Sequence, residues 1–167
     1  MAENPNPTPS FIRAGGILGN QVKLTNQVCT RVAPGNIPVV IYDNSGTYAS
    51  GNGAIVENLI VVATDVVTKS ILFLFVKFVN SATPEWLLYH EIDLPALASI
   101  TANTKPTNYP LRGDLRRIYG FAPNIGSNAF ADALRINGES RLIQLGVALG
   151  TAIGTNPIII YLEGGEY

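Results

Sequence analysis

Few side chains in this sequence have the types and spacing that catalysis or metal binding requires. The chain holds one histidine, His90, and one cysteine, Cys29. His90 has no partner at metal-ligand spacing, so we expect a hydrogen-bonded structural histidine there. Cys29 lies in an alternating apolar and polar context, and no His or Asp motif accompanies it. We therefore expect a small buried strand residue rather than a nucleophile.

The carboxylates closest to the histidine do not complete a site either. Glu91 and Asp93 share one face of an expected strand, and His90 points to the opposite face. By the same alternation, Trp86 and Ile92 share the face of His90. A glycosidase-like pair can also come from distant positions, and that alternative stays open. No phosphate loop, CxxC, HExxH or GxSxG pattern occurs, so we expect no enzyme, no catalytic residue, no metal and no cofactor.

Charge and hydropathy argue against nucleic acid and membranes as partners. The net charge is −1, and Lys and Arg form no long run that would neutralise phosphates. No stretch of 18 apolar residues exists, and residues 1–10 lack the basic and apolar regions of a secretory signal. Charged residues make up only 14% of the chain, against about 25% in an average protein. This favours a surface that other copies or a larger assembly partly cover.

Two apolar stretches, residues 54–64 and 70–79, organise the expected fold. Both are rich in β-branched and aromatic residues and contain neither Gly nor Pro, which is typical of strands. The turn residues Asp65 and Thr68 between them predict a β-hairpin that forms the core. Both faces of the second stretch are apolar. This predicts a strand at the centre of a sandwich or beneath a subunit contact.

The remaining pattern predicts an all-β chain. Strands are expected at residues 21–32, 37–42, 86–94, 141–149 and 157–163. About seven or eight strands with short connections, and no alternation of strands and helices, indicate a β-sandwich of jelly-roll-like type. A chain of 167 residues has the size of one domain. We divide it into an extended N-terminal arm, residues 1–20, and a single sandwich domain, residues 21–167.

The expected arm combines alternate prolines with an apolar tip. Pro5, Pro7 and Pro9 oppose a helix and favour an extended, polyproline-like chain. Phe11 and Ile12 follow, and they are unusual in a purely solvated tail. Two interpretations stay open at this point: a disordered tail, or an arm that lies on a neighbouring subunit.

From Ile55 onward the chain resembles a family of tailed-phage virion proteins that also occur in prophages. The resemblance covers about two thirds of the chain and rests on these segments: ENLIVVATD, ILFLFV, LLYHEIDLPA, TANTKP, INGESRLIQLGVAL and the terminal EGGEY. The final Gly-Gly-acidic-aromatic tetrapeptide is the most specific of them. The resemblance implies a non-enzymatic, structural role. We expect a cement or decoration protein that binds the shell of the major capsid protein on the exterior of the phage head, after assembly in the host cytoplasm.

Two other classes of function stay open. One is a tail, collar or baseplate component of the same kind of virion. The other is a carbohydrate- or receptor-binding sandwich, which needs a platform of exposed aromatics, for which Tyr48, Trp86 and Tyr109 are the candidates. For the structural role we expect self-association as a dimer or trimer. The candidate interface residues are Phe11, Ile12, Phe73, Phe75, Trp86 and Tyr167.

Overall fold

The computed structural model describes residues 14–32, 38–43, 54–79, 82–98, 107–110, 134–136 and 143–166. These ranges contain nine strands and no helix, so none of them holds a helix that is long and apolar enough to cross a membrane. The strands are β1 (Ala14–Leu24), β2 (Val39–Asp43), β3 (Ala54–Ala63), β4 (Ser70–Phe78), β5 (Trp86–Leu94), β6 (Thr107–Pro110), β7 (Leu134–Ile136), β8 (Ile143–Leu149) and β9 (Ile158–Glu166). The prediction of an all-β chain is confirmed.

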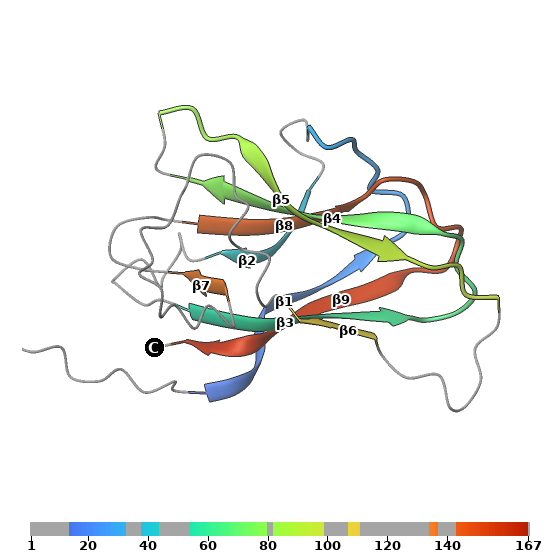
Figure 1. The fold of residues 1–167 in the computed structure, drawn as a ribbon, viewed down its shortest axis with the longest axis horizontal. Coiled ribbons are helices and arrows are strands. Elements are labelled where there is room, and N and C mark those ends of the chain that lie inside the picture. The colour runs from blue at the N-terminus through green and yellow to red at the C-terminus, as the bar shows by residue number, and fades with distance from the viewer. Residues whose placement is uncertain are drawn as a thin grey trace, which may run out of the picture.

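The strands form two antiparallel sheets that lie one above the other (Figure 1). The first sheet, the lower one in Figure 1, has the order β1-β9-β3-β6, and β7 also pairs with β3. The second sheet, the upper one, has the order β2-β8-β4-β5. Inward-facing side chains of both sheets share one apolar core, in which Leu24, Leu59, Leu74 and Leu149 are completely buried. This arrangement is that of a β-sandwich.

The predicted hairpin between residues 54–64 and 70–79 is wrong, although both strands exist. β3 lies in the first sheet and β4 in the second, so the two strands do not pair. Their apolar inner faces pack across the core instead, Leu59 and Val61 of β3 among the same cluster as Leu72 and Leu74 of β4. The six residues between the strands are enough to cross the gap of about 10 Å between packed sheets. As predicted, β4 is central in its sheet, between β8 and β5.

The N-terminal boundary of the sandwich also differs from the prediction. β1 begins at Ala14, inside the range 1–20 that we assigned to the arm, and its first residues pair with the end of β9. Gly19 has a φ of +73°, and a Cβ at this position would lie 2.3 Å from the carbonyl oxygen of Ile41. Glycine therefore lets β1 bulge and pass close to β2. Residues 1–13 lie outside the described residues.

The expected strand at 21–32 ends early, at Leu24. Residues 25–32, which we call the strap, leave β1 and run beside the end of β8. The backbone N–H of Cys29 donates to the carbonyl of Leu149 at 2.9 Å, and the N–H of Leu149 donates to the carbonyl of Gln27 at 2.8 Å. These bonds fix the strap to the second sheet, where it borders the outward face.

Candidate functional site

The outward face of the second sheet carries an apolar layer of its own. Along β4, Leu72, Leu74 and Val76 point into the core, so the residues between them point outward. Phe73 and Phe75 thereby join a second cluster, separate from the core. Its buried members are Cys29, Phe73, Phe75, Trp86 and Ala148, and the half-buried residues packed against it are Val40, Ile71 and Leu88.

Small residues on β8 give this layer its shape. Gly146 lies opposite Phe75 and Ala148 opposite Phe73 in the pairing of β4 with β8. A Cβ on Gly146 would lie 2.8 Å from Cη2 of Trp86, so the indole ring rests directly on the glycine. The rings of Phe73 and Phe75 meet edge to face, with centroids 6.0 Å apart and an interplanar angle of 61°, a favourable geometry for aromatic pairs.

The predicted interface residues fall into two groups. Phe73, Phe75 and Trp86 are only 5%, 0% and 8% exposed, because the strap and the other rings of the layer cover them. They are buried within the chain itself, and their part in an interface between chains stays a prediction. The other three candidates lie outside the described residues: Phe11, Ile12 and Tyr167.

The aromatic platform that a carbohydrate-binding module needs is not formed by Trp86. Its ring is buried, and Nζ of Lys77 lies 5.5 Å from the ring centroid. Tyr48 lies outside the described residues, and of Tyr109 only the backbone, in β6, is described.

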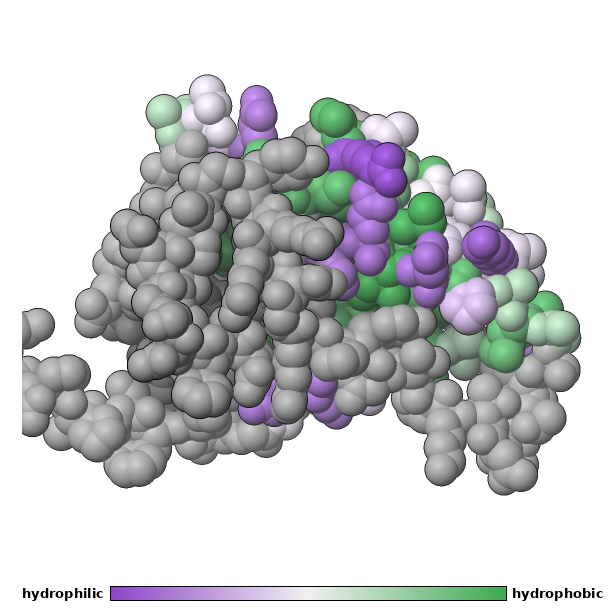
Figure 2. Space-filling model, in the orientation of Figure 1, coloured by the Kyte–Doolittle hydropathy of each residue, from purple (hydrophilic) through white to green (hydrophobic). Residues whose placement is uncertain are grey.

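A groove of about 530 Å³ opens beside the apolar layer, at the end of the sandwich where β4 begins. Ile71, Phe73 and Gly150 form its floor. The strap, through residues 29–31, forms one wall, and Asp93 of β5 stands on the other side. Figure 2 shows apolar and polar residues side by side on the described part of the face that it draws. A volume in this range suits a small ligand or a few side chains of a partner.

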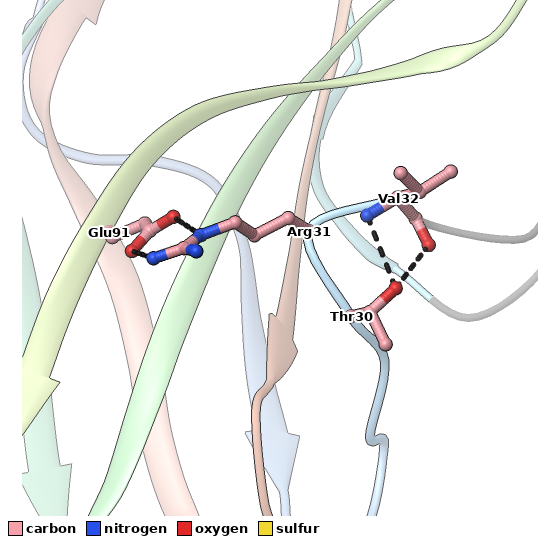
Figure 3. A network of polar contacts seen from close by, with 4 residues as sticks. All are labelled: Thr30, Arg31, Val32 and Glu91. Carbon is pink, nitrogen blue, oxygen red and sulfur yellow. Dashed lines mark hydrogen bonds and ion pairs between the residues drawn. The ribbon is translucent and has the colours of Figure 1, made fainter.

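An ion pair joins Arg31, which lines the groove, to Glu91 of β5. Nε of Arg31 donates to Oε1 of Glu91 at 2.5 Å and a terminal guanidinium nitrogen donates to Oε2 at 3.0 Å (Figure 3). Because Glu91 pairs with Phe73 across β4 and β5, the bridge passes over Phe73 from the strap to β5. The hydrogen bond from Arg31 outweighs partial burial and lowers the pKa of Glu91. The guanidinium is largely exposed, so this bridge stabilises the strap only modestly.

The strap also makes a turn around Thr30. Its hydroxyl donates to the carbonyl of Val32 at 3.0 Å and accepts from the N–H of Val32 at 3.3 Å (Figure 3). This turn directs Arg31 over the sheet and leaves Val32 79% exposed. Cys29, one residue before Thr30 in the strap, is buried. Burial raises the pKa of its thiol, so the thiol stays protonated and weakly nucleophilic near neutral pH.

A β-bulge changes which residues of β5 share a face. Leu74 pairs with His90, but Phe75 pairs with Leu88, so Tyr89 is an extra residue. Trp86 therefore belongs to the outer layer while Ile92 belongs to the core, and the prediction that they share a face is wrong. Glu91 and Asp93 do share the outward face, as predicted, through their pairing with Phe73 and Ile71.

The groove combines an apolar floor with charged groups of both signs, and this suits binding better than catalysis. Its titratable side chains are Cys29, Arg31, Lys69 and Asp93. A protonated thiol without a base beside it does not make an activated nucleophile. Among the described residues, no three His, Cys, Asp or Glu side chains come together as a metal site. A scan against protein-family models and searches of curated proteins and of solved structures give no match to this chain.

Proposed function

We propose that this protein is a structural component of a tailed-phage virion, a cement protein on the exterior of the head that binds the major capsid protein shell. The observation that carries the proposal is the nested pairing of the strands. β1 pairs with β9, β2 with β8, β3 with β6 and β4 with β5, so the early strands pair with the late ones. We take this as a jelly roll, in which a long antiparallel ribbon is rolled into two sheets.

The jelly roll narrows the choice of function without deciding it. This architecture is shared by viral capsid domains, lectins and cupins, and a fold alone does not define a function. A cupin needs several histidines for its metal, and this chain has only His90. A lectin-like role finds no platform at Trp86, which is buried. The resemblance of residues 55–167 to phage virion proteins then favours the structural role.

The low share of charged residues supports the same conclusion. A cement protein works by burying surface against a shell that presents hundreds of equivalent sites. At about 25 cal/mol per Å², an interface of roughly 1,600 Å² contributes large gross stabilisation at each site. Charged side chains oppose such burial because their desolvation is unfavourable. A chain with 14% charged residues is suited to contact over a wide area.

The test is the location of the protein on particles. The gene is tagged at its 3′ end in the phage or prophage that carries it, and gradient-purified particles are examined by mass spectrometry and by immunogold labelling. Labelling spread over the head is expected. Labelling confined to the tail, collar or baseplate favours that alternative, and absence of the protein from purified particles refutes the virion role.

A second measurement addresses stabilisation of the shell. Particles that lack the protein should release DNA at a lower temperature than decorated ones, and adding the purified protein should restore the higher temperature. A variant without residues 1–12 should fold, because β1 begins at Ala14, but it should bind the particles more weakly. Equal binding by the truncated and full chains would show that the arm takes no part.

A further inference from the structure

The groove and the start of β1 lie at opposite ends of the sandwich. Ala14 pairs with Glu166 at one end, and Leu24 pairs with Ile158 at the other. The groove is at the Leu24 end, because β4 begins there at Ser70 and the residues after β8 line it. Eleven residues of strand span about 35 Å at roughly 3.3 Å per residue.

This separation decides which groove Phe11 and Ile12 can reach. Phe11 lies three residues before Ala14, and three extended residues reach about 10 Å. The groove of the same copy is therefore out of range, whereas the groove of another copy is not. We infer that the groove of one copy binds residues 10–13 of a second copy, with Phe11 packed on Ile71 at the floor of the groove. The inference rests on the proposed structural function and on the self-association that we expect for it from the sequence, and it requires no capsid.

The apolar part of the segment matches the floor of the groove. Ile71 is half-buried, so a docked aromatic ring removes apolar surface on both sides from water. In an extended segment, Phe11 and Arg13 point to the same side. The groove offers Arg13 one opposite charge, the exposed Asp93, and two charges of the same sign, Lys69 and Arg31, of which Arg31 is paired with Glu91. The prolines that precede the segment reduce the conformational entropy lost on docking.

A contact between opposite ends restricts how copies associate. Copies joined arm to groove in succession form a ring or a chain, and two antiparallel copies that exchange arms form a closed dimer. In a ring or a closed dimer every arm fills one groove, whereas an open chain leaves one arm and one groove free at its ends. The dimer and the trimer expected from the sequence are both compatible with this rule.

A cysteine at an exposed position of the groove allows a direct test. Cys29 is buried, so the partner that supplies the groove carries Cys29→Ala together with Lys69→Cys; Lys69 lines the groove and is exposed. Three arm variants carry Cys29→Ala together with Ser10→Cys, Ile12→Cys or Arg13→Cys, which places the new cysteine on either side of Phe11. Each arm variant is mixed with the groove partner and oxidised, and disulfides between the two new cysteines are identified by mass spectrometry. Such a bond needs Cα atoms about 4.4–6.8 Å apart. At least one variant should cross-link, at least tenfold more than the control.

The control places a cysteine at the same end of the sandwich but outside the arm. Glu57, exposed on β3, serves this purpose as Glu57→Cys with Cys29→Ala. In a second comparison the groove partner also carries Ile71→Asn in the groove or, as its match, Val62→Asn on the outward face of the other sheet. Both positions are half-buried strand residues. Ile71→Asn should reduce cross-linking at least tenfold, and Val62→Asn should leave it unchanged.

Two results overturn the inference. In the first, none of the three arm variants cross-links more than the Glu57→Cys control. In the second, cross-linking stays unchanged when the partner carries Ile71→Asn and circular dichroism shows that this partner is folded. These outcomes are separate from the particle experiment. A protein found on phage heads that fails to cross-link keeps the proposed function and loses the arm contact. A protein that cross-links but is absent from particles keeps the contact and loses the virion role.

Discussion

Replacing Gly146 with alanine tests whether Trp86 is packed within the chain or available to partners. The glycine lies on the outward face of β8, beneath the indole ring, and its backbone is not in the left-handed region. A Cβ there would lie 2.8 Å from Cη2 of Trp86 and 2.8 Å from Cβ of Pro38. The added methyl group must therefore displace the ring, the proline or the strand.

The expected magnitude follows from these distances. Carbon atoms in contact prefer roughly 3.5 Å or more, so the neighbours of Gly146 must move by about 0.7 Å. Overpacking of this kind destabilises by about 1–3 kcal/mol. Reduced freedom of the unfolded chain offsets about 0.4–1 kcal/mol of that. We expect Gly146→Ala to lower the free energy of unfolding by about 1–2 kcal/mol.

Gly150 provides the matched control, because it lies just beyond β8 and faces the same layer. There the nearest atoms to a new Cβ are Cβ of Ile71 and Cε2 of Phe73, both at 3.4 Å, close to an ordinary contact. Gly150→Ala should be neutral or stabilising by up to about 1 kcal/mol. The two variants therefore differ chiefly in the clash with Trp86 and Pro38.

Urea unfolding followed by far-ultraviolet circular dichroism measures both variants, and the fluorescence of Trp86, the only tryptophan, reports displacement of the ring. Adding Trp86→Phe should reduce the effect of Gly146→Ala, because the smaller ring does not extend as far over β8. If Gly146→Ala is as stable as Gly150→Ala and leaves the fluorescence spectrum unchanged, the packing of Trp86 on β8 is refuted.

Three further predictions concern the strap and β5. The pKa of Glu91 is lowered below its usual value of about 4.5, so the ion pair with Arg31 stabilises the fold above that pH and is lost as the pH falls through the lower pKa of the folded state. In urea unfolding at pH 7, Glu91→Gln should therefore be less stable than the wild type by up to about 1 kcal/mol. This difference should shrink toward pH 3. Cys29 should react with a chromogenic disulfide reagent at pH 7 at least tenfold more slowly in the folded protein than in urea, and equal rates would contradict its burial. The hydroxyl of Tyr89 is buried with no hydrogen-bond partner among the described residues, so Tyr89→Phe should leave stability unchanged or raise it by up to about 1 kcal/mol, and a clear loss would reveal a partner.

Three of the strands that were predicted correctly share a simple physical property. Residues 54–63, 70–78 and 86–94 are dense in apolar, β-branched and aromatic side chains and lack Gly and Pro. Such segments need a pleated, buried surface wherever they lie in the fold. The pairing partners of these strands cannot be predicted in the same way, because side-chain alternation determines which face a residue lies on and not which strand lies beside it. β3 and β4 have equally apolar inner faces, and pairing them or packing them across a core satisfies the pattern equally well.

The elements that the sequence did not predict are those whose formation depends little on the pattern of apolar and polar side chains. Ala14, Gly15, Gly16 and Gly19 show no alternation, yet this segment begins β1 because the end of β9 supplies its hydrogen bonds. The bulge at Tyr89 leaves no mark in an alternating sequence, although it reverses the faces on its two sides. The groove was missed for a related reason. The groove forms because the strap leaves β1 and faces Asp93 of β5 across the start of β4. The sequence of the strap alternates like that of β1, so it predicts one continuous strand over residues 21–32 instead.

The outer layer changes what the apolar character of β4 implies about association. From the sequence, a strand with two apolar faces predicts either a central position or a subunit contact, and Phe73 and Phe75 are candidates for the contact. In the fold, the small residues of β8 make room for Trp86, and Cys29 of the strap joins the two phenylalanines in one buried cluster. The two phenylalanines are thus buried within one chain, whereas Ile71 on the same face of β4 is only half-buried. For the proposed self-association, the groove beside Ile71 is where, among the described residues, apolar side chains and exposed charges meet.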